Sequence, residues 1–295
     1  MSSKLLLVDG HAYAYRAFHA IRSLSGPDGA PTNAIFGFVK MLLKLELVVA
    51  PTHRLVLWDA GLAPERLAIL PEYKAQRPPT PEALELQFPQ LVDWLGAAGW
   101  SSWEQEDTEA DDWIGTYARR AEAEGWQVVV ASSDKDFQQL VNARIGLFNP
   151  NDKSEKIWSA ADVEAKIGVG PQQVVDWLAL VGDSVDNIPG LPGVGPKTAT
   201  DLLQRHGSID GMLAGLAAIK HERLRRDLET HAEILRRNQS MVRLKCDLAG
   251  GPGLPALAPR AADKSMLREM YRRWGFRSLL SELDDAGHPT QGELL

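Results

Sequence analysis

Three short apolar runs, each ended by an aspartate, mark the first half of the chain. They are KLLLVD, which ends at Asp9, RLVLWD, which ends at Asp59, and WQVVVASSD, which ends at Asp134. Apolar residues follow one another in these runs without alternating with polar ones, which is typical of strands covered on both faces. The pattern therefore predicts three buried strands.

Helical periodicity fills the segments between these runs. Helices are expected over 34–49, 84–99 and 109–125, with Pro89 interrupting the second. Alternation of strands and helices predicts an α/β fold, with a mostly parallel central sheet flanked by helices. Ligands bind such sheets beyond the carboxyl ends of the strands, so Asp9, Asp59 and Asp134 should point into one crevice.

The second half of the chain has a different pattern, with charged helices and no convincing strand beyond short pieces near 240. Helices are expected over 171–183, 196–207 and 217–244, then a linker-like loop over 250–262 and a frayed tail over 284–295. We therefore predict two parts, an α/β core over 1–170 and a helical region over 171–295.

Composition indicates a soluble globular protein, with 44% hydrophobic and 24% charged residues. A single cysteine excludes an internal disulfide and suits a reducing cytoplasm. We expect no signal peptide and no membrane span, because no apolar run is long enough. The net charge of −7 and the pI near 5.6 argue, taken alone, against a nucleic-acid partner.

Acidic residues gather at the positions that this fold sends to one edge of the sheet. Each has an ordinary explanation as a turn or helix cap, and Thr108 is expected to cap the helix that starts in TEADD. Together they form a set of nine carboxylates: Asp9, Asp59, Glu109, Asp111, Asp112, Asp134, Asp136, Asp183 and Asp186. Clustered acids repel one another unless cations neutralise them.

Oxygen ligands without His or Cys select hard cations, so the set predicts a site for Mg²⁺ or Mn²⁺. Multi-carboxylate sites of this kind often hold two ions and act on phosphoryl groups. For this chain we expect two or three ions. Without the nine acids, 30 acidic residues face 32 basic ones, so an acidic pI is compatible with a nucleic-acid enzyme.

The stretch GLPGVGPKT is close to a phosphate-binding P-loop, but Pro196 separates Gly195 from Lys197, and we reject nucleotide binding. We interpret it as a helix-hairpin-helix over about 174–206. Gly193 and Gly195 are expected to allow close approach and positive φ, and the following helix start can face phosphates. A plain tight turn between two packed helices is the alternative.

Two further segments offer contacts to nucleic acid. The basic stretch PEYKAQRPP places Lys74 and Arg77 where a cation can meet a phosphate, although a solvated loop explains it as well. Aromatic residues in YAYRAF can stack on bases, or belong partly to the core.

These motifs resemble those of the bacterial 5′-3′ exonuclease and flap endonuclease family. The resemblance rests on LLLVDGHAYAYRAFHA, PEYKAQRPPTP, EADD, ASSDKDFQQLV and LVGDSVDNIPGLPGVGPKTATDLL, which occur in the family's order up to about residue 283. It implies a PIN-like nuclease core with a helix-hairpin-helix, and a structure-specific enzyme that cleaves DNA near free 5′ ends. Ser133 departs from the glycine of many relatives.

Roles of individual residues follow from the same resemblance. The family's tighter metal cluster is matched by Asp9, Asp59, Glu109, Asp111 and Asp134. Its outer or shared positions are matched by Asp112, Asp136, Asp183 and Asp186. Lys74 and Arg77 match basic residues over the scissile phosphate in an arch at about 64–90, and Arg16 matches a DNA contact. The hairpin, with Gly190, Gly193, Gly195, Lys197 and Thr198, matches an element that grips duplex DNA around a K⁺ ion.

The resemblance implies two-metal hydrolysis of DNA flaps or of RNA–DNA primers, in replication and repair, by a cytoplasmic monomer that can act with a DNA polymerase. Two other functions stay open: a DNA-structure binder without catalysis, and a metal-dependent ribonuclease. The sequence does not decide between a free-standing nuclease and part of a longer polymerase.

Overall fold

The computed structural model describes residues 3–285 of the chain. One sheet has the strand order β3-β2-β1-β4-β5-β6, and a separate pair joins β7 to β8. The strands are β1 Lys4–Asp9, β2 His53–Leu57, β3 Ser101–Trp103, β4 Gln127–Ala131, β5 Ile145–Phe148, β6 Ile157–Trp158, β7 Gly182–Asp183 and β8 Ile188–Pro189. Every pairing in the large sheet is parallel except the last, between β5 and β6.

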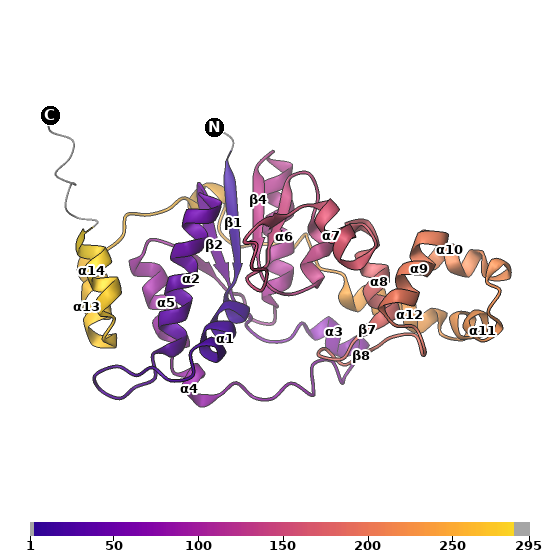
Figure 1. Cartoon of the computed structure of the whole chain (residues 1–295), viewed down its shortest axis with the longest axis horizontal. Coiled ribbons are helices and arrows are strands. Elements are labelled where there is room, and N and C mark those ends of the chain that lie inside the picture. Colours follow the sequence, from indigo (N-terminus) through magenta and orange to yellow (C-terminus); the bar gives the residue numbers. More distant parts are fainter. Residues whose placement is uncertain (1–2, 286–295) are drawn as a thin grey trace.

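Helices surround this sheet and form the rest of the molecule (Figure 1). The α-helices are α1 Gly10–Ala20, α2 Asn33–Val49, α3 Pro64–Ile69, α4 Glu82–Glu85, α5 Phe88–Ala97, α6 Ala110–Ala123, α7 Ala160–Ile167, α8 Val174–Val181, α9 Pro196–His206, α10 Ile209–Ala214, α11 Glu222–Thr230, α12 Ala232–Val242, α13 Lys264–Trp274 and α14 Arg277–Asp285. Short 3₁₀ turns occur at η1 Asp136–Leu140, η2 Pro171–Gln173, η3 Leu216–Ala218 and η4 Leu254–Leu257.

The three predicted strands are β1, β2 and β4, which lie side by side at the centre of the sheet. Successive residues of β1 enter opposite cores, with Leu5 and Leu7 on one face and Leu6 and Val8 on the other. Burial on both faces explains the unbroken apolar run. The sequence pattern missed β3, β5 and β6, which are short and lie toward the edges of the sheet.

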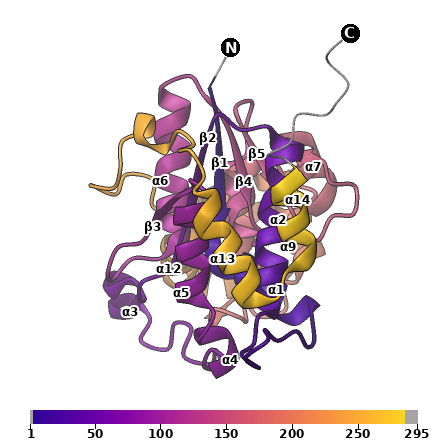
Figure 2. The same cartoon turned by 90° about the vertical axis from the view of Figure 1, so that its left-hand side faces the viewer.

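Each face of the sheet has its own helical cover. One core contains apolar residues of α1, α2 and α5, and the other contains those of α6 and α8. Figure 2 shows α5, α13 and α2 on the side that faces the viewer, with the strands behind them. In the strand order β3-β2-β1-β4-β5-β6, the chain direction across the sheet reverses between β1 and β4. Open α/β sheets bind their ligands beside such a reversal, at the carboxyl ends of the strands.

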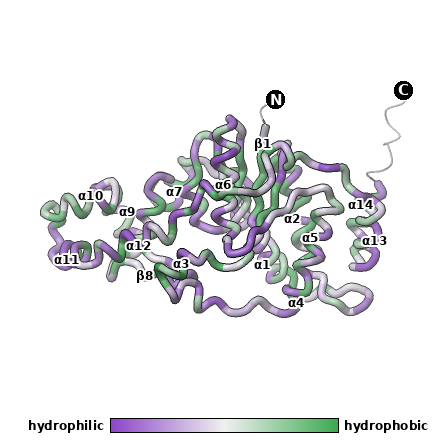
Figure 3. The backbone as a smooth tube through the Cα atoms, turned by 180° about the vertical axis from the view of Figure 1, so that it is seen from behind, coloured by the Kyte–Doolittle hydropathy of each residue, from purple (hydrophilic) through white to green (hydrophobic). Residues whose placement is uncertain are grey.

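A third core, which includes Leu203, Met212 and Leu235, holds α8 to α12 together at one end of the molecule. The predicted helix over 217–244 is two helices, α11 and α12, which meet at His231. The short strands expected near 240 are absent, and among the residues from 171 to 285 the only strands are β7 and β8. In Figure 3 the central strands are mostly green, whereas α11 is largely purple.

The last two helices return to the opposite end of the molecule, as Figure 1 shows. Trp274 of α13 packs in the same core as α2 and α5, and Trp94 donates a hydrogen bond to the Tyr271 hydroxyl at 3.0 Å. The expected helical region over 171–295 is therefore not one spatial unit, because 264–285 pack on the α/β core. Its boundary near residue 170 stays a prediction.

Most of the tail predicted over 284–295 lies outside the described residues; Asp284 and Asp285 end α14. From residue 3 to residue 285, no helix combines the length and the apolar character that a membrane crossing requires.

Candidate active site

A pocket of about 520 Å³ opens at the carboxyl edge of the sheet. Five acids from four separate segments line it: Asp9, Asp59, Glu109, Asp111 and Asp134. Asp9 ends β1, Asp59 and Asp134 follow β2 and β4, and Glu109 and Asp111 lie at the start of α6. The crevice expected from the strand pattern is therefore present. His11, Tyr15, Lys74 and Arg77 line the same pocket. We call it the acidic pocket.

Two of these acids also cap the local backbone. Asp9 accepts hydrogen bonds from the Ala12 amide and the Ser132 hydroxyl, both at 2.9 Å. Asp134 accepts one from the Asp136 amide at 2.8 Å. The capping and the pocket-lining interpretations therefore both hold, because a carboxylate has lone pairs for more than one partner.

The helix α6 begins differently from the prediction. Glu109, and not Thr108, is its N-cap residue. The Ala110 amide donates instead to the Asp59 carboxylate at 2.8 Å, so an acid after β2 caps a helix that starts 51 positions later. This bond joins the carboxyl end of β2 to the first residue of α6.

Burial and mutual repulsion perturb the acids of the pocket. Burial, and then the charge of Asp59, raises the pKa of Asp9 to about 7. Burial and the charges of Asp134 and Asp9 raise the pKa of Asp111 well above its usual range. Such a set of oxygen donors is costly when ionised and fits a hard divalent cation, which favours the ionised form.

A second group of acids adjoins the pocket through Asp134. Burial, and then the charge of Asp134, raises the pKa of Asp136 well above its usual range, and Asp183 and Asp186 act in the same direction. One carboxylate oxygen of Asp136 is buried without a hydrogen-bond partner. These three acids are not among the residues that line the acidic pocket, and they stay predicted ligands.

The protein's own cations pair with several of these acids. Lys74 contacts Glu109, Lys135 lies 3.1 Å from Asp183, and Arg77 lies 2.6 Å from Asp186. Within residues 3–285, no three carboxylate, His or Cys side chains are arranged as ligands of one ion. The donors are therefore close to one another but partly engaged by basic side chains.

Lys74 is the most buried of these cations, and its alternative interpretation as part of a solvated loop is wrong. Its side chain is 6% exposed and lies 4.9 Å from the centre of the Tyr73 ring. Burial alone would lower the pKa of Lys74, but the charge of Glu109 overrides it and raises the pKa. Lys74 is therefore a fixed cation on the pocket wall.

The segment around Lys74 is tied to the loop that carries the last two acids. The Lys74 amide donates to the Asp186 carbonyl at 3.1 Å, and the Asn187 side chain donates to the Glu72 carbonyl at 2.9 Å. Gln76 donates to the Asn187 side chain at 3.2 Å. Both Lys74 and Asn187 have positive φ, of 55° and 59°.

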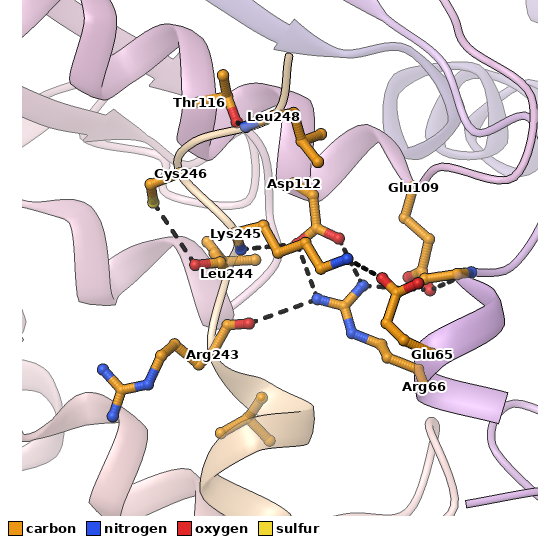
Figure 4. A network of polar contacts seen from close by, with 12 residues as sticks. Glu65, Arg66, Glu109, Asp112, Thr116, Arg243, Leu244, Lys245, Cys246 and Leu248 are labelled. Carbon is orange, nitrogen blue, oxygen red and sulfur yellow. Dashed lines mark hydrogen bonds and ion pairs between the residues drawn. The ribbon is translucent and has the colours of Figure 1, made fainter. Parts of the chain in front are cut away.

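Asp112, one residue after a pocket acid, does not line the pocket. Its carboxylate is 1% exposed, and both oxygens accept hydrogen bonds from the Arg66 guanidinium, at 2.7 and 2.8 Å (Figure 4). The Lys245 amide donates a third bond at 2.9 Å. Its oxygens are therefore engaged within the protein and outside the acidic pocket, and its role as a metal ligand stays a prediction.

The predicted hairpin joins α8 to α9, through the pair β7–β8. Gly193 has φ of 76°, as expected, but Gly195 has φ of −95° and is extended. Close approach occurs at Gly190, where an added Cβ would lie 2.3 Å from the Val181 carbonyl oxygen. Pro196 begins α9, and Lys197 is exposed with Thr198 beside it. The first amides of α9 are free of intrahelical partners.

Arg16 lies outside the acidic pocket. Its guanidinium donates to the Pro150 carbonyl at 2.8 Å and to the Asn151 side chain. In the same helix, Tyr13 belongs to the core, whereas Tyr15 lines the pocket and its hydroxyl lies 2.7 Å from the Thr80 hydroxyl. The predicted DNA contact by Arg16 stays a prediction.

Sequence reasoning missed three polar residues around the pocket. Tyr73 donates to Glu109 at 3.1 Å, Arg66 lies 3.3 Å from the same carboxylate, and Ser132 holds Asp9. Tyr73 stands inside the quoted motif PEYKAQRPP, so proximity to Lys74 could have found it. Arg66 lies in APERLAIL, where one arginine on a short helix gives no signal.

Two family descriptions match the chain in succession. Residues 4–168 match "5′-3′ exonuclease, N-terminal resolvase-like domain", and residues 169–265 match "5′-3′ exonuclease, C-terminal SAM fold". A 5′-3′ exonuclease from Aquifex aeolicus is 36% identical over 280 residues, which cover 95% of each chain. DNA polymerase I from Bacillus caldotenax is 38% identical over 96% of this chain, which spans 33% of that polymerase.

Solved structures share the fold at lower identity. The T5 D15 protein co-crystallised with metal ions has a TM-score of 0.68 and 20% identity, over 96% of this chain and 97% of the other. The catalytic core of Rad2 in complex with DNA substrate has a TM-score of 0.64 and 14% identity, over 98% and 93%. These likenesses confirm the predicted fold, a mostly parallel sheet with flanking helices and a helical second part.

Proposed function

The chain belongs to the 5′-3′ exonuclease family, and from this premise we propose that it is a 5′ nuclease that hydrolyses DNA phosphodiester bonds at flaps and free 5′ ends. One observation carries the proposal: carboxylates from segments about 125 positions apart line one pocket that also contains Lys74. We propose a role in primer or flap removal during replication and in repair.

The acids fit divalent cations by their chemistry, since all donors are oxygens and Asp136 has an unpartnered buried oxygen. Burial and neighbouring acids also raise the pKa of Asp9, Asp111 and Asp136. Asp9, Asp59, Glu109, Asp111 and Asp134 would hold one ion, and Asp136, Asp183 and Asp186 would complete a second site with Asp134. When bound, Mg²⁺ or Mn²⁺ would activate water and stabilise the leaving oxygen.

The basic side chains of the pocket wall would act on the phosphate. Lys74 is charged and immobilised before substrate arrives, so its interaction with developing negative charge needs little reorganisation. Arg77 is 44% exposed in its side chain and can exchange Asp186 for a phosphate oxygen. Both residues are proposed to orient the scissile phosphate over the acids.

The hairpin is proposed to hold the duplex beside the pocket. Its exposed Lys197 and the free amides at the start of α9 suit phosphate contacts that do not depend on base sequence. The T5 and Rad2 structures contain metal ions or DNA, and by analogy we propose DNA as this chain's substrate. A K⁺ ion at the hairpin and a DNA contact by Arg16 remain parts of this proposal.

The test is the variant Asp134→Asn on a labelled 5′-flap DNA with Mg²⁺. Asparagine keeps the oxygen that accepts from the Asp136 amide but removes the charge shared by both acid groups, so we expect cleavage to fall by about 10²–10³-fold with folding intact. Undiminished cleavage would refute the proposal.

Asp263→Asn is the matched control, because Asp263 also accepts backbone hydrogen bonds but is the N-cap residue of α13, away from the pocket. Binding of the flap without Mg²⁺-dependent cleavage would favour the DNA-binder alternative. Cleavage of a matched RNA flap in preference to DNA would favour the ribonuclease.

A further inference from the structure

Arg66 is a buried arginine that precedes Lys74 by eight residues. It lies in α3 and is 5% exposed, yet it makes polar contacts with two other segments (Figure 4). Two nitrogens bind Asp112 in the first turn of α6, and one of them lies 3.4 Å from the Arg243 carbonyl oxygen after α12. A buried arginine with such partners is fixed in orientation.

Asp112 fixes the same three segments from the other side. Its Oδ1 accepts from both Arg66 and the Lys245 amide, and its Oδ2 accepts from Arg66. The pair Arg66–Asp112, which we call the clamp, therefore connects α3, the first turn of α6 and the chain that leaves the helical region.

Glu109 is the pocket acid next to this clamp. Its Oε1 lies 3.3 Å from Arg66 Nη1, and its Oε2 contacts Lys74 and the Tyr73 hydroxyl. The side chain is 2% exposed, so its neighbours fix its orientation. Because α6 begins directly after Glu109, any rotation of the first turn of α6 would move this carboxylate.

We propose that Arg66 is a positioning residue, which acts through Asp112 to orient Glu109 toward the cation of the acidic pocket. The proposal rests on the proposed function, in which Glu109 is a ligand. It assigns to Asp112 the role of anchoring Arg66 in place of the ligand role expected from the sequence.

A role of Arg66 by charge and a role by geometry predict opposite changes in cation affinity when Arg66 is removed. A guanidinium 3.3 Å from Glu109 repels a divalent cation, so removing an Arg66 that acted only by charge would tighten cation binding. A positioning Arg66 gives the reverse result, because cation binding weakens when the carboxylate loses its orientation. Lysine separates the two cases, since it keeps the charge but cannot form the planar two-nitrogen contact with Asp112.

The experiment measures Mn²⁺ binding to the full chain without DNA, by calorimetry, for Arg66→Lys and Arg66→Met. We expect both variants to bind Mn²⁺ about 10-fold or more weakly. We also expect single-turnover flap cleavage at fixed saturating Mn²⁺ to fall, while flap affinity in EDTA stays within about twofold. Tighter Mn²⁺ binding by Arg66→Met, or wild-type binding by Arg66→Lys, would overturn the proposal.

Arg54→Met is the matched control, because Arg54 forms an ion pair with Glu46, with 11% of its side chain exposed, and β2 carries it near the end opposite the pocket. Its Mn²⁺ affinity should equal that of the wild type whatever its stability.

If Arg66→Met does not fold, the result for Arg66→Lys alone decides the role of Arg66. If Asp134→Asn abolishes cleavage and Arg66→Lys changes nothing, only the role of Arg66 fails; if Asp134→Asn also changes nothing, the proposed function fails.

Discussion

Asp111 and Asp112 are neighbours in the chain and lie in opposite electrostatic surroundings. Asp111 faces Asp9, Asp59 and Asp134, and burial together with the charges of these acids raises its pKa. Asp112 faces Arg66, which binds both of its oxygens. In the acidic pocket, basic side chains of the protein balance the carboxylates only in part, whereas Arg66 directly balances the charge of Asp112.

The difference teaches how one helical turn can serve two purposes. Unbalanced acids lower the stability of the fold but offer oxygens to a ligand of opposite charge, whereas a balanced buried pair holds segments in place. The same substitution, aspartate to asparagine, at these adjacent positions is a direct way to separate the two roles.

Flap cleavage should show the largest difference. Asp111→Asn removes a proposed ligand, so we expect cleavage to fall by about 10²–10³-fold. Asp112→Asn should lower it by about 10–100-fold, since it acts only through the placement of Glu109. Rates are measured in single turnover at saturating DNA. Equal losses in the two variants would remove the distinction between the regions.

The free energy of unfolding should fall in Asp112→Asn and not in Asp111→Asn, the reverse of the order expected for cleavage. Asp112→Asn removes the charge that both nitrogens of the buried Arg66 bind and leaves only Glu109 near it, which we expect to lower the free energy of unfolding by about 3 kcal/mol. Asp111→Asn relieves repulsion and should raise it by about 1 kcal/mol in the absence of divalent ions. Urea titrations with EDTA measure both values, and a stabilised Asp112→Asn would contradict the assignment of the clamp.

Added Mg²⁺ should stabilise the protein only where the acids can bind it. At about 100 times the dissociation constant, binding to the folded state alone adds about 2.7 kcal/mol. We expect this increase in the wild type, a smaller one in Asp112→Asn at the same Mg²⁺ concentration, and almost none in Asp111→Asn. Urea titrations over a Mg²⁺ series provide the measurement, and a full wild-type response in Asp111→Asn would argue against its ligand role.

Lys197→Ala should have the smallest effect, because it removes one phosphate contact at the hairpin and leaves both acidic regions unchanged. We expect a few-fold loss of flap affinity, a slope of affinity against salt that is smaller by about 1, and no dependence on DNA sequence. Fluorescence anisotropy without divalent ions measures it. Lys264→Ala, an exposed lysine on α13, is the control, and equal losses in both variants would contradict a specific role for the hairpin.

The sequence predicted the centre of the fold better than its periphery. Unbroken apolar runs identified β1, β2 and β4 because burial on both faces imposes that composition, and the aspartates that follow them reach one pocket. By contrast, β3 has the sequence SSW and β5 has IGLF, which are too short to show a period.

The errors at the site have one physical cause, which is that partners come from distant segments. The partner of Asp112 lies 46 residues earlier, and the cap of α6 comes from Asp59 and not from Thr108 beside it. The return of α13 to the α/β core depends likewise on contacts such as that of Tyr271 with Trp94, 177 positions away. Local pattern cannot specify such pairings.

The bonds between residues 72–77 and residues 186–187 have a consequence for protein engineering. Backbone and side-chain groups of both segments satisfy one another, and each segment has a residue with positive φ at the junction. A chimaera that imports 64–80 from a homologue must therefore import a compatible 183–189 as well. The two stretches, more than a hundred positions apart, would be exchanged as a single cassette.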